Sequence, residues 1–323
     1  MVRALASASS LGGDSDGRSD RPAERQVGVT ALDPLEGVLA LSSDRMAMSV
    51  DMAYGARVTD LTDRATGRQW LLPGPRVEDK SDAVVFRGAA SRGWDECFPT
   101  ILPCNEQAWG GRLRDHGMLW GRPWVAVDAG PTHLTAHFDG SGIRFTRSLA
   151  VHGAEVIARY SVSSTRAATV PYLWSQHCVL RVTPSDRLFV SGQGRMSAGS
   201  VDFDWPAHPV RDLTQIGATD EGLVVKAYAR TPLVGMAQIN GPQGGLRFDW
   251  DGAEVPALGL WLAYGGWPEE APLHQLAIEP TTAAADDLAG AIQLGQARWL
   301  APDETHSWSV RLTLLDPEEG HVP

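Results

Sequence analysis

One glutamate stands inside an apolar stretch near the C-terminal end of this 323-residue chain. Glu279 lies in the run Leu276-Ala277-Ile278-Glu279-Pro280-Thr281-Thr282, which has the composition of a strand that stops at a proline. Burial raises the pKa of a carboxyl group toward neutrality, where the group can accept and return a proton. Glu279 is therefore a candidate general base. The structural alternative is a buried salt bridge between Glu279 and an arginine.

Two histidines have equally distinctive surroundings. His116 belongs to Asp115-His116-Gly117, just before the tryptophan-rich run 120–124, and His177 lies in the aromatic and aliphatic segment 172–180. Imidazole titrates near neutral pH, so both side chains are natural proton carriers for a carboxylate partner. Taken singly, each could instead be a core histidine whose ring is hydrogen-bonded to a backbone carbonyl.

The order of these residues, with the sequence around them, resembles the aldose 1-epimerase (galactose mutarotase-like) family. The likeness extends over roughly residues 45–315. Four blocks carry it: Tyr54–Asp63 with Gly67 and Trp70-Leu71; Asp115-His116-Gly117; Tyr172–Leu180; and a closing region made of Pro256–Trp261, Gly265-Gly266-Trp267, Ile278-Glu279-Pro280 and Leu300–Thr305. Cys178 stands where the better-known members usually have a proline, so the chain resembles a divergent branch.

The resemblance implies an all-β fold, a large antiparallel β-supersandwich, and an isomerase that needs no metal or other cofactor. In such an enzyme a base removes the proton of the anomeric hydroxyl while an acid protonates the ring oxygen, so the ring opens and recloses as the other anomer. The implied roles are base for Glu279, acid for His177 and hydrogen-bonding partner of the substrate for His116. A substrate-binding aspartate is also implied, and the candidates for it are Asp202, Asp204 and Asp251.

Five further residues are candidates for contact with a sugar. The segment 91–100 combines glycine-flexed turns with polar side chains, which is typical of a loop at the mouth of a pocket. Arg92, Trp94 and Glu96 are its candidates, and the resemblance implies an arginine at about the position of Arg92. Trp174 and Trp261 are candidates for stacking on a sugar face. The alternatives are a solvated turn for the loop and core packing for the tryptophans.

The patterning predicts one large β domain. Apolar and polar residues alternate at 143–149, 156–162 and 308–314, as expected of half-buried strands, and only 286–294 has the pattern of a helix, a short one. We expect a single domain over residues 29–318, flanked by a disordered tail at 1–28 and a short tail at 319–323. The first segment has no apolar run long enough for a signal peptide or a membrane span, so a cytoplasmic protein is expected.

Charge and motif content restrict the partners. A net charge of −11 without a basic cluster argues against nucleic acid and anionic membranes. No glycine-rich phosphate loop precedes a helix, which argues against a nucleotide cofactor. Cys97, Cys104 and Cys178 lack metal-ligand spacing and fit reduced, buried thiols. A nucleophilic Cys178 beside His177 is disfavoured, because strand neighbours point to opposite faces. The expected partner is a small sugar or glycoside, and the oligomeric state is not determined.

Three functions are compatible with these observations. The first is an aldose 1-epimerase (mutarotase) acting on a free sugar or a sugar derivative; a phosphorylated substrate stays open because Arg112, Arg114 and Arg122 lie near His116. The second is a lyase or hydrolase that uses the same pocket on a glycoside or another natural product. The third is a non-catalytic carbohydrate-binding protein in which the histidines and Glu279 only hold hydroxyl groups.

Overall fold

Antiparallel strands make up nearly all of the regular structure of this protein. The computed structural model describes residues 37–76, 86, 90–192, 194–229 and 235–317, all within the unit formed by residues 32–323. The described residues form a ten-stranded sheet, an eight-stranded sheet and three two-stranded sheets, with one α-helix of 6 residues. The predicted all-β architecture is confirmed. The predicted tails at 1–28 and 319–323 lie outside the described residues.

The ten-stranded sheet contains most of the residues singled out in the sequence. Its central strands are buried on both faces, as the continuous apolar runs around Glu279 and His177 predict. In spatial order the strands are β1 (Val38–Ser42), β2 (Met46–Asp51), β3 (Arg57–Asp63), β4 (Trp94–Cys97), β12 (Ser175–Leu180), β22 (His274–Thr281), β21 (Ala257–Tyr264), β18 (Leu223–Ala229), β14 (Arg195–Ala198) and β15 (Val201–Asp204).

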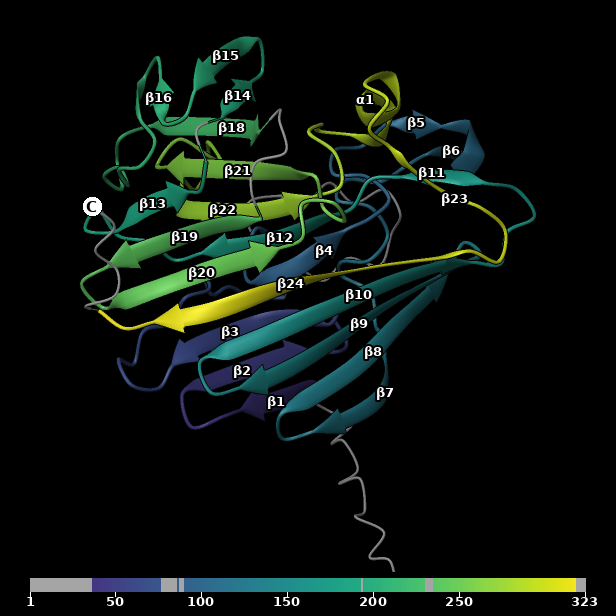
Figure 1. The fold of residues 1–323 in the computed structure, drawn as a ribbon, viewed down its shortest axis with the longest axis horizontal. Helices are drawn as coiled ribbons and strands as arrows, with labels where there is room; N and C mark the ends of the chain where they lie inside the picture. Colours follow the sequence, from purple (N-terminus) through teal and green to yellow (C-terminus); the bar gives the residue numbers. More distant parts are fainter. Residues whose placement is uncertain (1–36, 77–85, 87–89, 193, 230–234, 318–323) are drawn as a thin grey trace, which may run out of the picture. The chain divides into compact units, whose positions relative to one another are not determined.

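The eight-stranded sheet lies face to face with the first (Figure 1). Its strands in spatial order are β13 (Arg187–Val190), β19 (Met236–Gly241), β20 (Gly244–Trp250), β24 (Thr305–Leu315), β10 (Glu155–Ser164), β9 (Ile143–His152), β8 (His133–Gly140) and β7 (Val125–Gly130). The three alternating segments predicted as strands correspond to β9, β10 and β24, which are hydrogen-bonded neighbours in this sheet. Their two-residue period directs one set of side chains into the space between the sheets.

A charged cluster inside the sandwich joins the two sheets. Glu96 on β4 accepts hydrogen bonds from Arg147 on β9 and Tyr160 on β10, both at 3.1 Å. Trp94 and Trp174 donate to the same carboxylate through their indole N–H groups, at 3.1 and 3.0 Å. Burial raises the pKa of Glu96 to about 7, although the charge of Arg147 opposes the rise. The cluster is therefore a fully hydrogen-bonded polar group within an otherwise apolar core.

Strand β4 corrects the prediction of a loop over residues 91–100. Its four residues are all buried, and the strand lies between β3 and β12 in the middle of the sheet. The two adjacent carboxylates, Asp95 and Glu96, suggested a solvent-exposed segment. Each one instead pairs with a buried arginine on opposite faces of the strand, Asp95 with Arg57 and Glu96 with Arg147. A buried charge with a partner is compatible with a central strand, and sequence alone did not reveal the partners.

Most of the remaining elements gather at one end of the sandwich, whereas one two-stranded sheet lies beside β15 (Figure 1). The predicted short helix is present as α1 (Leu288–Gln293), with Asp287 as its N-cap accepting from the Gly290 N–H at 2.7 Å. It buries Leu288 and Ala291 in a small second core. The two-stranded sheets pair β5 (Asn105–Glu106) with β6 (Gly111–Arg112), β11 (Val170–Tyr172) with β23 (Arg298–Leu300), and β16 (Ala207–His208) with β17 (Arg211–Asp212); a 3₁₀ helix, η2 (Gln107–Trp109), precedes β6.

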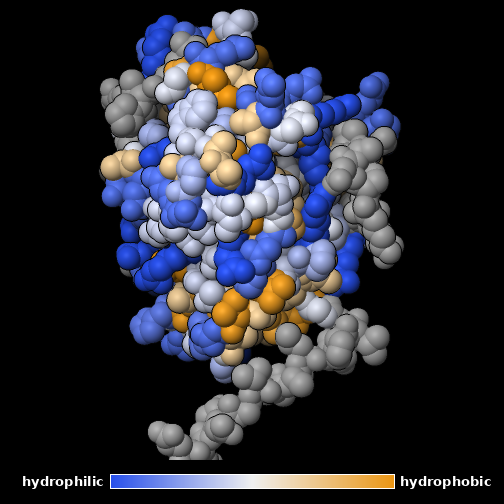
Figure 2. Space-filling view, turned by 90° about the vertical axis from the view of Figure 1, so that its right-hand side faces the viewer, coloured by the Kyte–Doolittle hydropathy of each residue, from blue (hydrophilic) through white to orange (hydrophobic). Residues whose placement is uncertain are grey.

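The surface seen from that end is largely hydrophilic, with apolar side chains gathered toward its lower edge (Figure 2). On the outermost strand β7, Val125 and Val127 are 58% and 64% exposed. None of the helices in the described part of the chain is long and apolar enough to span a membrane.

Candidate active site

Asp95, His177 and Glu279 form a row across three adjacent strands. His177 on β12 is paired with Asp95 on β4. The register that pairs Ser175 with Thr281 and Cys178 with Ile278 places His177 opposite Glu279 on β22. Directly opposed residues share a face of the sheet, with Cβ atoms about 4.5–5.5 Å apart. The two candidate catalytic groups that lie about 100 residues apart in sequence are therefore cross-strand neighbours.

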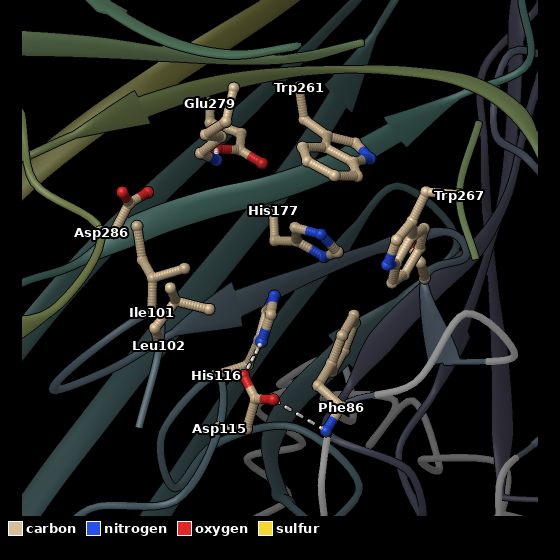
Figure 3. Close-up of a pocket in the computed structure, with 12 residues that line it drawn as sticks. Phe86, Ile101, Leu102, Asp115, His116, His177, Trp261, Trp267, Glu279 and Asp286 are labelled. Carbon is tan, nitrogen blue, oxygen red and sulfur yellow. Dashed lines mark hydrogen bonds and ion pairs between the residues drawn. The ribbon is translucent and has the colours of Figure 1, made fainter. Parts of the chain in front are cut away.

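This row lies on the floor of a cavity of about 410 Å³ on the face of the sheet away from the sandwich core. Figure 3 shows His177 in its centre, with Glu279 and Trp261 on one side and His116 and Phe86 on the other. The lining residues are Phe86, Ser91, Ile101, Leu102, Asp115, His116, His177, Lys226, Trp261, Trp267, Glu279 and Asp286. Its volume is within the range of about 300–1,000 Å³ usual for small-molecule sites. Nowhere in the described residues do three or more His, Cys, Asp and Glu side chains cluster so as to hold a metal ion.

A buried ion pair orients His177. Its Nδ1 lies 2.9 Å from Asp95 Oδ1, while the other carboxylate oxygen of Asp95 accepts from Arg57 Nη2 at 2.6 Å and Nε at 3.1 Å. Burial by itself would raise the pKa of Asp95, but the charges of Arg57 and His177 outweigh it and hold the pKa well below its usual range. Asp95 is therefore a carboxylate that fixes the imidazole and leaves Nε2 of His177 for a substrate.

His116 reaches the cavity from a left-handed turn. Its φ is 57° and that of Gly117 is 71°, and a Cβ on Gly117 would lie 1.9 Å from the carbonyl oxygen of Phe98. Only glycine fits there, which explains the Gly of the Asp-His-Gly motif. Nδ1 of His116 lies 2.8 Å from Asp115 Oδ1, and Phe86 stacks on the ring with centroids 3.6 Å apart.

The environment keeps His116 neutral. Burial lowers its pKa, and the hydrogen bond to Asp115 does not overcome that effect. A neutral imidazole whose Nδ1–H donates to Asp115 has an unprotonated Nε2, which is a hydrogen-bond acceptor. His116 is thus suited to accept a hydrogen bond from a hydroxyl group.

Glu279 is paired with a lysine that the sequence analysis did not consider. The carboxylate, 3% exposed, makes a very short contact with Nζ of Lys226 on β18. Burial would raise the pKa of Glu279, but the charge of Lys226 outweighs it and the net shift is downward. The expectation of a pKa raised toward neutrality is therefore wrong. The alternative of a buried salt bridge named an arginine, whereas the partner in the structure is a lysine.

The Glu279 carboxylate fits on the sheet because the residue opposite it on the next strand is a glycine. Gly259 on β21 is paired with Glu279, and a Cβ there would lie 2.9 Å from Glu279 Oε2. The Glu279 carboxylate and the ring of Tyr228 therefore pack closely over this glycine.

Known structures with this arrangement of strands define the fold. The sequence matches no protein-family model and no curated protein. A galactose mutarotase-like protein from Lactobacillus casei superposes with a TM-score of 0.63 at 14% identity, over 86% of this chain and 100% of its own. A galactose mutarotase-like protein from Clostridium acetobutylicum superposes with a TM-score of 0.66 at 14% identity, over 86% of this chain and 95% of its own. The galactose mutarotase related enzyme from Lactobacillus acidophilus superposes with a TM-score of 0.65 at 11% identity, over 87% of this chain and 98% of its own.

The chain has the galactose mutarotase-like fold. Its structural relatives across most of the chain are aldose 1-epimerase and galactose mutarotase-like proteins, all at low sequence identity. The recognition made from the four sequence blocks is confirmed at the level of the fold.

Within the galactose mutarotase-like fold, only Trp261 of the five predicted sugar-binding residues lines the cavity, and the other four need correction. Trp94, Glu96 and Trp174 are at most 1% exposed and belong to the cluster between the sheets. For Trp94 and Glu96 the cause is strand alternation, because Asp95 lies on the same face as His177 and its neighbours must face the other way. Arg92 also lies outside the cavity lining and donates to the Ser91 carbonyl at 2.9 Å.

The aspartate and cysteine predictions have similarly clear outcomes. Asp202, Asp204 and Asp251 are absent from the cavity lining, which instead contains Asp115 and Asp286. All three cysteines are free, and burial raises the pKa of the Cys97 and Cys178 thiols well above the usual range, as expected of unreactive thiols.

Sequence reasoning missed the charged partners of the site, Arg57, Asp95 and Lys226. Composition could have pointed to Lys226, because the chain contains only two lysines, Lys80 and Lys226, and Lys226 lies in an apolar strand. Strand alternation could have pointed to Asp95, because it places Asp95 and Glu96 on opposite faces.

Proposed function

We propose that this protein is a cofactor-free aldose 1-epimerase that interconverts the anomers of a free sugar or a close derivative. The observation that carries the proposal is the pairing of Asp95-supported His177 directly opposite Glu279 on neighbouring strands of one cavity floor. A base and an acid at this spacing can reach two atoms of one sugar ring at the same time.

In the proposed reaction the anomeric carbon of the sugar lies above the space between the two groups. Glu279 takes the proton of the anomeric hydroxyl while Nε2–H of His177 donates to the ring oxygen, so the bond between the ring oxygen and the anomeric carbon breaks and a carbonyl forms. Rotation about the adjacent carbon–carbon bond and reversal of both transfers close the ring as the other anomer. Asp95 holds Nδ1 of His177 and so orients the ring, and Nε2 of His116 accepts a hydrogen bond from another hydroxyl.

The aromatic walls suit the apolar faces of a sugar. Trp261 and Trp267 meet at 90° with ring centroids 5.4 Å apart and form a corner above the floor. Phe86 covers His116 on the other side. C–H groups of a pyranose pack well on such rings, and a few polar groups then set its orientation.

The Lys226 contact favours a second candidate, a carbohydrate-binding protein without catalysis. An ion pair with Lys226 lowers the basicity of Glu279, and a carboxylate–ammonium pair is a good clamp for hydroxyl groups. The same cavity would then bind a sugar without exchanging its anomers.

Magnetisation-transfer NMR distinguishes the two candidates. Anomer exchange is followed for glucose, galactose, xylose and their 6-phosphates in the presence of wild type, of Glu279→Gln and of Glu254→Gln, which changes an exposed glutamate. We expect wild type and the control to accelerate exchange, and Glu279→Gln to abolish it with sugar affinity kept within roughly tenfold. Binding without acceleration by wild type would support the second candidate. Exchange at the wild-type rate in Glu279→Gln would refute the proposed role of that residue.

A further inference from the structure

A second cavity, of about 530 Å³, adjoins the candidate active site. Lys226 and Asp286 line both cavities, so the two share a boundary. Six residues describe the rest of the lining that the argument uses: Ser197, His208, Val210, Val224, Tyr228 and Leu294. Each cavity alone has a volume within the range of about 300–1,000 Å³ common for small ligands. Together they offer more room than one sugar ring requires.

The floor of the sheet continues from one cavity into the other. Gly259 is paired with Glu279 on one side and with Tyr228 on the other, and Tyr228 is paired with Ser197. Residues paired in this way share a face, so the row that begins at Asp95 runs through Glu279 to Ser197 without changing sides. The side chains of Glu279 and Tyr228 both pack over Gly259, so these two groups form the boundary between the cavities at that point.

The boundary between the cavities is polar and held in position. Tyr228 donates its O–H to Asp286 Oδ1 at 3.0 Å, and burial raises the pKa of Tyr228 well above the usual range, so the donor keeps its proton. Lys226 contacts Glu279 from the same boundary. A donor and an acceptor at the junction match a linkage between two rings, where hydroxyl groups of both rings converge.

The walls of the second cavity combine polar and apolar groups. Val210, Leu294 and Val224 are 66%, 57% and 41% exposed, which is unusual for aliphatic side chains that line a hollow. Ser197 and His208 provide hydroxyl and imidazole groups beside them. Aliphatic surface next to hydrogen-bonding groups is what a second pyranose ring, with C–H faces and hydroxyl edges, would cover.

We propose that the second cavity binds the next sugar ring of a substrate of two or more rings, whose reducing-end ring lies between His177 and Glu279. This inference rests on the proposed function for the identity of the reacting ring. It defines the substrate class as reducing oligosaccharides, because the ring that exchanges its anomers must keep a free anomeric hydroxyl and the extension must leave from another hydroxyl.

The test compares glucose, galactose and xylose with reducing disaccharides built on each, such as cellobiose, maltose, gentiobiose, galactobiose and xylobiose. Affinity is measured by calorimetry and anomer exchange by magnetisation-transfer NMR on the same samples. The proteins are wild type, Val224→Trp, which fills the second cavity, and Val125→Trp, the same substitution on an exposed valine of strand β7.

We expect at least one disaccharide to bind wild type about tenfold more tightly than its own reducing monosaccharide. Val224→Trp should remove that advantage while leaving the monosaccharide affinity unchanged, and Val125→Trp should change neither. Equal affinity for one and two rings, or an advantage that persists in Val224→Trp, would overturn the inference. Exchange of monosaccharides without that preference refutes the inference alone, whereas the preference without exchange refutes only the proposed isomerase. Absence of both binding and exchange refutes both.

Discussion

The contact between Lys226 and Glu279 makes the substitution Lys226→Met a quantitative test of how the site is charged. The side chains are 20% and 4% exposed, so solvent screens the pair only weakly. Two unit charges about 4 Å apart attract by about 4 kcal/mol at an effective dielectric constant of 20. Removal of one partner from a buried pair costs about 3–5 kcal/mol. We expect Lys226→Met to lower the free energy of unfolding by about 3 kcal/mol at pH 8.

The loss should depend on pH in a defined direction. In the wild type the folded-state pKa of Glu279 lies below its ordinary value of 4.5, so its stabilising contribution is present above that pH and is lost as the pH falls through the lower value. In Lys226→Met only the weaker charges of His177 and His116 oppose burial, so we expect burial to raise the folded-state pKa of Glu279 and stability to be lost as the pH rises through the raised value. The difference between the two proteins should therefore grow from about pH 3 to pH 8.

Urea denaturation at intervals across that range measures the difference. Arg247→Met is the matched control, because Arg247 pairs with Asp249 at 2.8 Å on an exposed part of the second sheet, where the expected loss is at most about 1 kcal/mol. The double variant Lys226→Met with Glu279→Gln should recover much of the stability. The acid limb of the pH profile of anomer exchange should also shift to higher pH in Lys226→Met than in wild type, because Glu279 then becomes protonated at a higher pH. A loss that is the same at every pH would refute the electrostatic reasoning and assign Lys226 a packing role.

Two further predictions concern the supports of the histidines. Asp95→Asn leaves Arg57, which is 3% exposed, without a counterion, so it should lower the free energy of unfolding by about 3–5 kcal/mol at pH 7. Urea denaturation measures this loss, and adding Arg57→Met should restore part of it. An unchanged urea midpoint in Asp95→Asn would contradict the role of the buried pair. Gly117→Ala should lower the free energy of unfolding by about 2 kcal/mol or more and slow anomer exchange, because its Cβ meets a backbone carbonyl at positive φ. The control Gly153→Ala, at φ 53° with open space around it, should lower it only by the conformational strain of about 1–2 kcal/mol. Equal losses in the two variants would show that the clash at position 117 is relieved.

Much of the fold could be predicted because local patterns survive in the structure. Alternation predicted β9, β10 and β24, and the periodicity of residues 286–294 predicted the short helix. Glu279 and His177 were identified because an ionisable group in an apolar strand is uncommon. The same alternation, applied to residues 94–97, places Asp95 and Glu96 on opposite faces, and it accounts for two of the corrected binding candidates, Trp94 and Glu96.

The sequence by itself determined the class of fold, the strands that carry Glu279 and His177, and the turn that presents His116, because these depend on periodicity, composition and the steric needs of glycine. Only the tertiary structure decided which charges meet. Burial raises the pKa of Glu279, but the net shift is downward because of Lys226, which is 53 residues away in sequence and two strands away in the sheet. Likewise, the close packing of Glu279 and Tyr228 over Gly259 arises from the order of strands, which brings distant segments together in a register that no local pattern encodes.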